Sequence, residues 1–254
     1  MSQGEAHRPR STASLIVLGA AALAVFLGLL ALGIWQVERR AWKLDLIARV
    51  DQRVAAEPVA PPGPDGWARV TADQDEYRHV RISGRFLNDR EAQVTASTMK
   101  GAGYWVMTPL QADDGTVVLV NRGFVPTENR DPATRAAGQM EGPLTVTGLL
   151  RITEPKGGFL RSNDPAAERW YSRDVAAIAA ARGLTDAAPY FIDADATPNP
   201  GGLPVGGLTV IAFPNSHLVY AITWFGLAAL LAFGVGYAVR SERRRESSLR
   251  RRDA

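Results

Sequence analysis

The chain has 254 residues and a formal net charge of +3, and it contains no cysteine. Without cysteine it has no disulfides, no thiolate metal site, no thiol chemistry and no covalent attachment of a c-type haem. The basic character is concentrated at one end, where residues 240–254 hold seven arginines against three carboxylates.

Two apolar runs, residues 15–34 and 218–239, contain no charged side chain. At about 1.5 Å per residue, each can cross a hydrocarbon core of roughly 30 Å. The first could instead be a cleavable signal sequence, because Ala31-Leu32-Gly33 resembles a cleavage site. Signal sequences have apolar stretches of only about 7 to 15 residues. We therefore predict transmembrane helices at 15–35 and 218–239.

Charge predicts the orientation of these helices. The basic tail, residues 240–254, is expected in the cytoplasm, and two spans place residues 1–14 there too. Arg39, Arg40 and Lys43 follow the first span and oppose this orientation, but long domains cross membranes largely regardless of charge. The domain between the spans is therefore predicted to be periplasmic.

An arginine-rich tail could also bind nucleic acid, but beside a membrane span it is more typical of a topology signal or a lipid contact. We predict lipid contact and no nucleic acid. Only 14 residues precede the first span, which disfavours a mitochondrial transit peptide and favours a bacterial inner membrane location.

The segment between the spans begins with a predicted amphipathic helical stem at 36–57, where Trp42, Leu46, Val50 and Val54 recur near helical spacing. Residues 58–217 then form a mainly antiparallel β domain. Its expected strands are 77–87, 91–97, 104–111, 116–124, 143–151, 189–193 and 208–213. Asp113-Asp114-Gly115 predicts a hairpin, and Asp174 and Gly183 predict the two ends of a helix. The expected fold is a membrane-anchored α+β protein whose domain is a small barrel or sandwich with one or two helices.

Small residues recur every four positions in both spans and favour packing of the two helices. They are Ala20, Ala24 and Gly28 in the first span and Ala228, Ala232 and Gly236 in the second. Such spacing also arises by chance in alanine-rich apolar segments.

His217 stands at the outer mouth of the second span, and Tyr220 and Trp224 share its helical face. An imidazole beside aromatic side chains suits a haem, whose iron takes an axial histidine. The alternative is a polar anchor in the interfacial aromatic belt. At the outer end of the first span, Arg39 and Arg40 could pair with haem propionates or could be interface anchors.

No catalytic motif is recognisable, since the sequence has no GxSxG, HExxH or P-loop. Asp193 and Asp195 alternate after an apolar run, which could indicate metal or acid–base chemistry. A carboxylate pair needs a third partner for such work, so we expect these residues at the edge of a loop. The chain is predicted not to be an enzyme.

Five segments, in this order, resemble signature segments of the surfeit locus protein family. They are LGIWQVERRAWKLDLI from Leu32, VLVNRGFVP ending at Pro126, RWYSRD from Arg169, PYFIDAD from Pro189 and NSHLVYAITWF from Asn215. The chain departs from the family pattern at Phe124, where a tryptophan is usual, and at Ser216, where a second asparagine is frequent.

The resemblance implies a cytochrome c oxidase assembly factor that binds haem a transiently and assists its insertion. His217 matches the proposed ligand of the haem iron. The expected site comprises His217, Trp224, Tyr220, Trp35, Arg39 and Arg40. The expected partners are the catalytic subunit of cytochrome c oxidase and a haem a synthase. The rival interpretation is a membrane scaffold that stabilises an oxidase assembly intermediate through protein contacts only.

Overall fold

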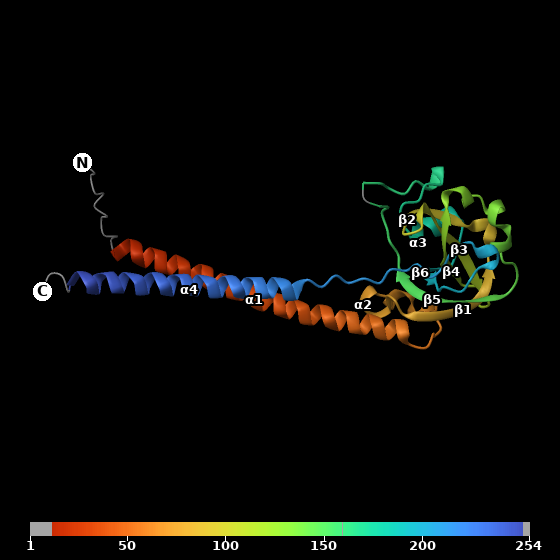
Figure 1. The fold of residues 1–254 in the computed structure, drawn as a ribbon. Helices are drawn as coiled ribbons and strands as arrows, with labels where there is room; N and C mark the ends of the chain where they lie inside the picture. Colours follow the sequence, from red (N-terminus) through yellow and green to blue (C-terminus); the bar gives the residue numbers. More distant parts are fainter. Residues whose placement is uncertain (1–11, 159, 251–254) are drawn as a thin grey trace, which may run out of the picture. The chain divides into compact units, whose positions relative to one another are not determined.

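The computed structural model describes residues 12–158 and 160–250 (Figure 1). It contains two compact units: one comprises the chain up to Ile47 and from Ala212, and the other runs from Ala48 to Ile211. Residues 1–11, most of the predicted cytoplasmic N-terminus, and the last part of the arginine tail lie outside the described residues. The described helices and strands are α1 (Thr12–Ala55), α2 (Ala72–Asp75), β1 (His79–Phe86), β2 (Ala92–Thr98), β3 (Gly101–Ala112), β4 (Val117–Pro126), β5 (Leu144–Ile152), α3 (Val175–Ala181), β6 (Ala187–Ala194) and α4 (His217–Arg250).

The two long helices, α1 and α4, are long and apolar enough to cross a membrane. α1 continues without a break for 44 residues and ends before Pro58, since a proline restricts the residue before it to extended backbone. Both helices expose large apolar side chains along most of their length, for example Ile16 (66%) and Leu230 (66%). Exposed apolar surface of this extent is typical of helices that face lipid.

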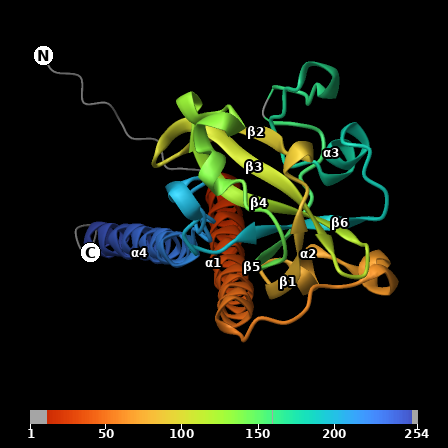
Figure 2. The ribbon, with the colours of Figure 1, turned by 90° about the vertical axis from the view of Figure 1, so that its right-hand side faces the viewer.

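The unit from Ala48 to Ile211 is built around a closed β-barrel (Figure 1, Figure 2). Five strands follow one another in the order β1-β5-β6-β4-β3, and β3 pairs again with β1 to close the ring. β3 is long enough to pair first with β2 and then with β1. All pairs are antiparallel except β4 with β6. The predicted mainly antiparallel β domain is confirmed, and the structure is a barrel rather than a sandwich.

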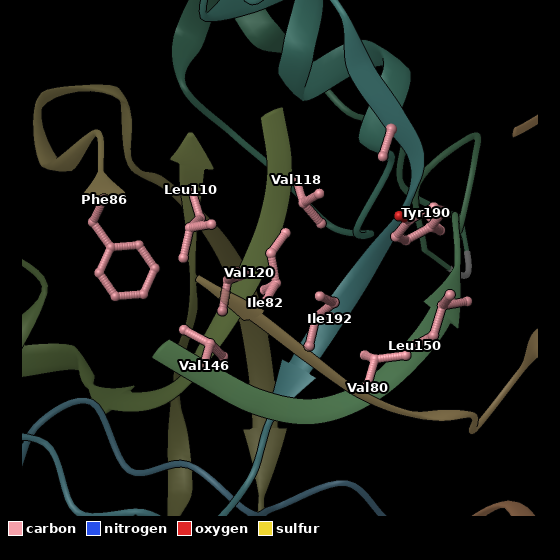
Figure 3. Close-up of a cluster of buried hydrophobic side chains, with 11 residues drawn as sticks. Val80, Ile82, Phe86, Leu110, Val118, Val120, Val146, Leu150, Tyr190 and Ile192 are labelled. Atoms are coloured by element: carbon pink, nitrogen blue, oxygen red, sulfur yellow. The ribbon is translucent and has the colours of Figure 1, made fainter. Parts of the chain in front are cut away.

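The barrel interior is filled by one apolar cluster (Figure 3). It includes Ile82 of β1, Val120 of β4, Leu150 of β5 and Ile192 of β6. A second cluster packs outside the barrel. There Ile178 of α3, together with Trp170 from the segment before this helix, covers Leu119 and Phe191. Residues 118–121 of β4 are buried throughout, because one face of this strand lines the interior and the other lies under α3.

Two local predictions are confirmed in detail. The hairpin between β3 and β4 turns at Gly115, whose φ of +86° suits glycine, and the Asp114 carboxylate accepts hydrogen bonds from Thr116. These bonds lower the pKa of Asp114. The helix α3 begins where Asp174 accepts a hydrogen bond from the Ala177 amide, and Gly183 after it has a φ of +61°.

One predicted strand, residues 208–213, is wrong, because this segment forms no strand. The segment has the apolar, β-prone composition of a strand, but the pairing of β4 with β6 ends at Asn121 and residues 208–213 do not continue it. Only Val205 forms a bridge, to Phe124 near the end of β4. Extended backbone becomes a strand only where it pairs with a neighbouring strand.

Candidate functional site

The helices α1 and α4 contact one another through side chains at alternating steps of four and three residues. The less exposed positions are Ala22, Phe26, Leu29, Gly33, Gln36, Arg40 and Lys43 in α1 and His217, Ala221, Trp224, Ala228 and Leu231 in α4. This repeat of about 3.5 residues is typical of helices that pack side by side with a small crossing angle.

The helices approach closely at Gly33, where an added Cβ would lie 2.6 Å from Cε1 of Phe225. The predicted packing through Ala20, Ala24 and Gly28 is wrong: all three are exposed, and a Cβ on Gly28 would meet no neighbour within 4 Å. Of the three small residues predicted in α4, only Ala228 is buried. The reason is the repeat: steps of four drift around a helix, whereas alternating steps of four and three stay on one face.

His217 is held by the other helix. Its Nδ1 lies 2.7 Å from Oε1 of Gln36, a side chain that is 8% exposed. An amide oxygen only accepts, so the contact requires the imidazole proton on Nδ1. A proton on Nδ1 is the tautomer in which a metal-ligating histidine offers Nε2 to the metal while its other nitrogen is hydrogen-bonded.

A cation–π contact lies next along the same pair of helices. Lys43 Nζ lies 5.2 Å from the centre of the Phe213 ring, just before α4 begins. Gly33 with Phe225, Gln36 with His217 and Lys43 with Phe213 therefore follow one another in antiparallel order. These contacts fix the register of the two helices at the position of His217.

The other predicted site residues differ from one another in their exposure and in their contacts. Trp224 is half-buried, and its indole Nε1 is buried without a hydrogen-bond partner among the described residues. Trp35 and Tyr220 are 52% and 54% exposed. The Arg39 guanidinium lies 4.3 Å from the centre of the Trp42 ring, and Arg40 is half-buried. Gln36 was not among the predicted site residues. The sequence signal for it is that a polar side chain occupies a position of the heptad repeat.

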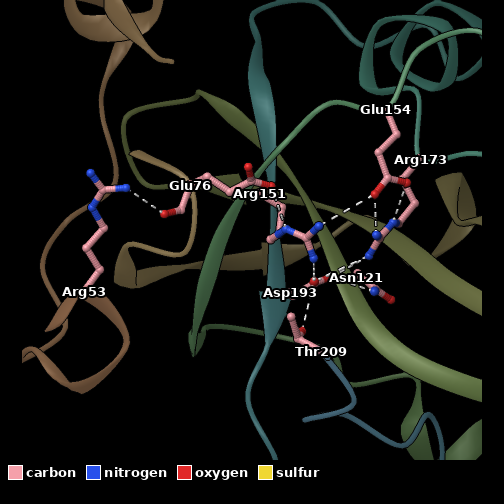
Figure 4. Close-up of polar contacts among 8 residues, drawn as sticks. All are labelled: Arg53, Glu76, Asn121, Arg151, Glu154, Arg173, Asp193 and Thr209. Atoms are coloured by element: carbon pink, nitrogen blue, oxygen red, sulfur yellow. Dashed lines mark hydrogen bonds and ion pairs between the residues drawn. The ribbon is translucent and has the colours of Figure 1, made fainter. Parts of the chain in front are cut away.

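Besides the polar contacts of the helix pair, the barrel contains a polar cluster, which is centred on Asp193 of β6 (Figure 4). Its carboxylate is 2% exposed and accepts hydrogen bonds from four side chains. The donors and distances are Asn121 Nδ2 at 2.7 Å, Arg151 Nη1 at 2.9 Å, Arg173 Nη1 at 3.1 Å and Thr209 Oγ1 at 2.9 Å. The predicted loop-edge position is therefore wrong for Asp193, which is buried within β6, whereas Asp195 lies at the loop edge directly after Ala194, the last residue of the strand.

Both arginines of this cluster have a second carboxylate partner. Arg173 also binds Glu154, and Arg151 binds Glu76 (Figure 4). Burial lowers the pKa of Arg151, but Asp193, Tyr77 and Glu76 outweigh it, and the net shift is upward. The cluster borders a cavity of about 220 Å³ that Trp105 also lines. A carboxylate with all its acceptor positions used has little capacity for acid–base work, so the cluster serves to join β4, β5 and β6 to the segment that carries Thr209.

Comparison with known protein families matches residues 23–229 to the SURF1 family. The matched range contains the barrel, α1 from residue 23 onward and the first 13 residues of α4, and it includes Gln36, Asp193 and His217. The chain belongs to the SURF1 family. Among SURF1-family relatives, it is 38% identical over 219 residues to Surfeit locus protein 1 of Homo sapiens, covering 80% of this chain and 71% of the human protein. It is 41% identical over 214 residues to a SURF1-like protein of Monosiga brevicollis, covering 78% of each chain.

Proposed function

We propose that this chain is an assembly factor for cytochrome c oxidase that holds haem a at the outer mouth of α1 and α4 and assists its insertion. Membership of the SURF1 family supports the coarse statement, a role in oxidase assembly. The finer statement, haem binding, rests on the contact between His217 and Gln36.

That contact supports ligation because it meets two requirements of a metal ligand before the metal binds. It holds the imidazole ring in one orientation, and it keeps the proton on Nδ1 so that Nε2 remains a lone-pair donor. Haem a would supply the iron to which Nε2 of His217 binds.

The residues around His217 fit the same group. Trp224 adds an apolar surface and a buried N–H donor that has no partner among the described residues, and a polar group on a bound ring could satisfy this donor. Tyr220 and Trp35 are half-exposed aromatic side chains that can cover a flat ring. Arg39 and Arg40 are the proposed partners of the propionates.

The role we propose is that of a non-enzymatic chaperone in the inner membrane of a bacterium. The barrel faces the periplasm and both termini lie in the cytoplasm, as the arginine-rich tail favours. The catalytic subunit of the oxidase receives the haem, and a haem a synthase is the second proposed partner. Membrane lipid contacts the helices.

The decisive experiment compares two histidines. Protein purified from cells that make haem a is expected to show a low-spin haem spectrum, and His217→Ala is expected to lose at least about nine-tenths of it, because the iron loses its ligand. His79→Ala is the matched control: its Nδ1 contacts the Ala56 carbonyl at 2.7 Å, in the barrel unit. This control should keep the spectrum.

Gln36→Leu separates positioning from ligation. It removes the acceptor of Nδ1 but leaves His217 in place, so haem should still bind, with weaker retention and a shifted reduction potential. A colourless wild-type protein, or a spectrum unchanged in His217→Ala, would refute haem binding. Oxidase assembly that survives His217→Ala would instead support the scaffold.

A further inference from the structure

Arg122 of β4 is a buried cation with an unusual set of contacts. The residue is 1% exposed, and its guanidinium carbon lies 4.6 Å from the centre of the Phe86 ring. Its Nη2 donates to the Gly138 carbonyl and, at 3.1 Å, to Oδ1 of Asn199. Both acceptors are neutral, so neither compensates the charge.

The rest of the guanidinium is unsatisfied. Nε and Nη1 are buried and have no hydrogen-bond partner in the described part of the chain, and no carboxylate there forms an ion pair with Arg122. Arg135 provides the contrast, because it is also buried but is paired with Glu91. Burial lowers the pKa of Arg122 to about 10, so the group is still cationic at neutral pH.

A buried, unpaired guanidinium is strongly unfavourable unless an anion or ordered polar groups satisfy it. Arg122 also lines a cavity of about 170 Å³, enough for a small molecule of a few heavy atoms. The remaining walls are mainly apolar and include Phe86, Met140 and Leu144. One carboxylate, Asp195, borders the cavity, and its Oδ1 already accepts a hydrogen bond from the Thr197 amide.

We propose that this cavity binds a small organic monocarboxylate, with its carboxylate on Arg122 and its short apolar chain against Phe86, Met140 and Leu144. A monoanion matches the single unpaired guanidinium, and Asp195, which also lines the cavity, repels a phosphate dianion more strongly than a monocarboxylate. The apolar walls favour an alkyl group over a purely inorganic anion. This site is independent of His217 and of the proposed haem function.

The test measures the melting temperature of the full chain in detergent micelles during titration with acetate, propionate and butyrate. Ionic strength is held constant with chloride. Binding to the native state should raise the melting temperature in a saturable way. Half of the effect should occur at a lower concentration for butyrate than for acetate, because butyrate buries more apolar surface.

Two variants locate the effect. Arg122→Met should abolish the saturable shift, while Arg85→Met, which removes an exposed arginine of β1, should preserve it. Because Arg122→Met could prevent folding, Thr197→Trp is the second variant: it places a large side chain at an exposed position on the rim of the cavity. It should abolish the shift without lowering the melting temperature in chloride.

Three results would overturn the proposal. They are a shift that rises without saturating, a shift that sulfate reproduces at the same ionic strength, and a saturable shift that survives Thr197→Trp. The first two would mean an adventitious ion only, and the third would mean that the carboxylate binds outside this cavity.

Discussion

The Asp193 cluster of the barrel and the helix pair differ in how far their buried polar groups are satisfied. In the barrel, Asp193 receives hydrogen bonds from four side chains, and the two arginines among them have further carboxylate partners. In the helix pair, His217 has one partner, Gln36, and the indole nitrogen of Trp224 has none among the described residues.

This difference separates groups that stabilise from groups available for binding. A buried polar network in which every member is satisfied specifies one structure and resists change. A polar atom without a partner costs free energy unless a ligand completes it, so such atoms indicate where a ligand binds. Breaking the first kind of site should mainly reduce stability, and changing the second kind should mainly alter binding.

The largest effect is expected from Asp193→Ala. Arg151 and Arg173, whose side chains are 13% and 14% exposed, would lose the carboxylate between them. Removing one partner of a buried ion pair costs about 3–5 kcal/mol, because the remaining charge is uncompensated. We expect the free energy of unfolding of the barrel to fall by this amount, measured by urea denaturation with tryptophan fluorescence.

Asp195→Ala is the matched control for Asp193→Ala, since it removes the carboxylate two residues further along the chain. Asp195 only accepts the hydrogen bond from the Thr197 amide at 2.9 Å, so its loss should cost about 1 kcal/mol. Equal losses in the two variants would show that Asp193 is not a buried centre of charge.

The next largest effect is expected from Gly33→Leu, which should disturb the helix pair and leave the barrel unchanged. The new side chain would collide with the Phe225 ring and separate α1 from α4. Since the chain has no native cysteine, cysteines introduced at Lys43 and Phe213 can report the separation through a short bifunctional cross-linker. The cross-linking yield should fall several-fold, and barrel unfolding should be unchanged.

Gly28→Leu adds the same side chain one and a half turns away, where a Cβ meets no neighbour within 4 Å. It should leave the yield unchanged. If both leucine variants cross-link equally well, the contact through Gly33 does not hold the helices together.

The sequence predicted local features well because local features depend on nearby residues. The hairpin at Gly115, the cap of Asp174 and six of the strands follow from alternation and turn chemistry. The apolar spans follow from length and composition alone.

The errors concern relations between distant segments. Residues 208–213 have the composition of a strand but pair with no described strand, and the burial of Asp193 depends on Arg151 and Arg173 from other segments. Packing of the spans was predicted from steps of four, whereas the structure uses the heptad repeat that contains Gln36. The partner of His217 lies 181 residues away in the sequence, so no local pattern could have paired them.

The smallest effect is expected from Glu168→Gln, at the surface of the barrel unit. Both carboxylate oxygens of Glu168 bind Arg182, at 2.6 and 2.5 Å, and this hydrogen bonding lowers the pKa of Glu168 below its usual 4.5. The stabilisation is therefore fully present above pH 4.5 and is lost as the pH falls through the lowered pKa. Because the Glu168 side chain is 52% exposed, water screens the pair, and the variant should lose less than about 1 kcal/mol at neutral pH. Urea denaturation at neutral pH should show this small difference in the free energy of unfolding. At a pH below the lowered pKa, the wild type and the variant should have the same stability. Glu141→Gln, at another exposed position, is the control and should match the wild type at every pH. A difference that persists in acid would mean that the carboxylate stabilises the fold through its shape rather than its charge.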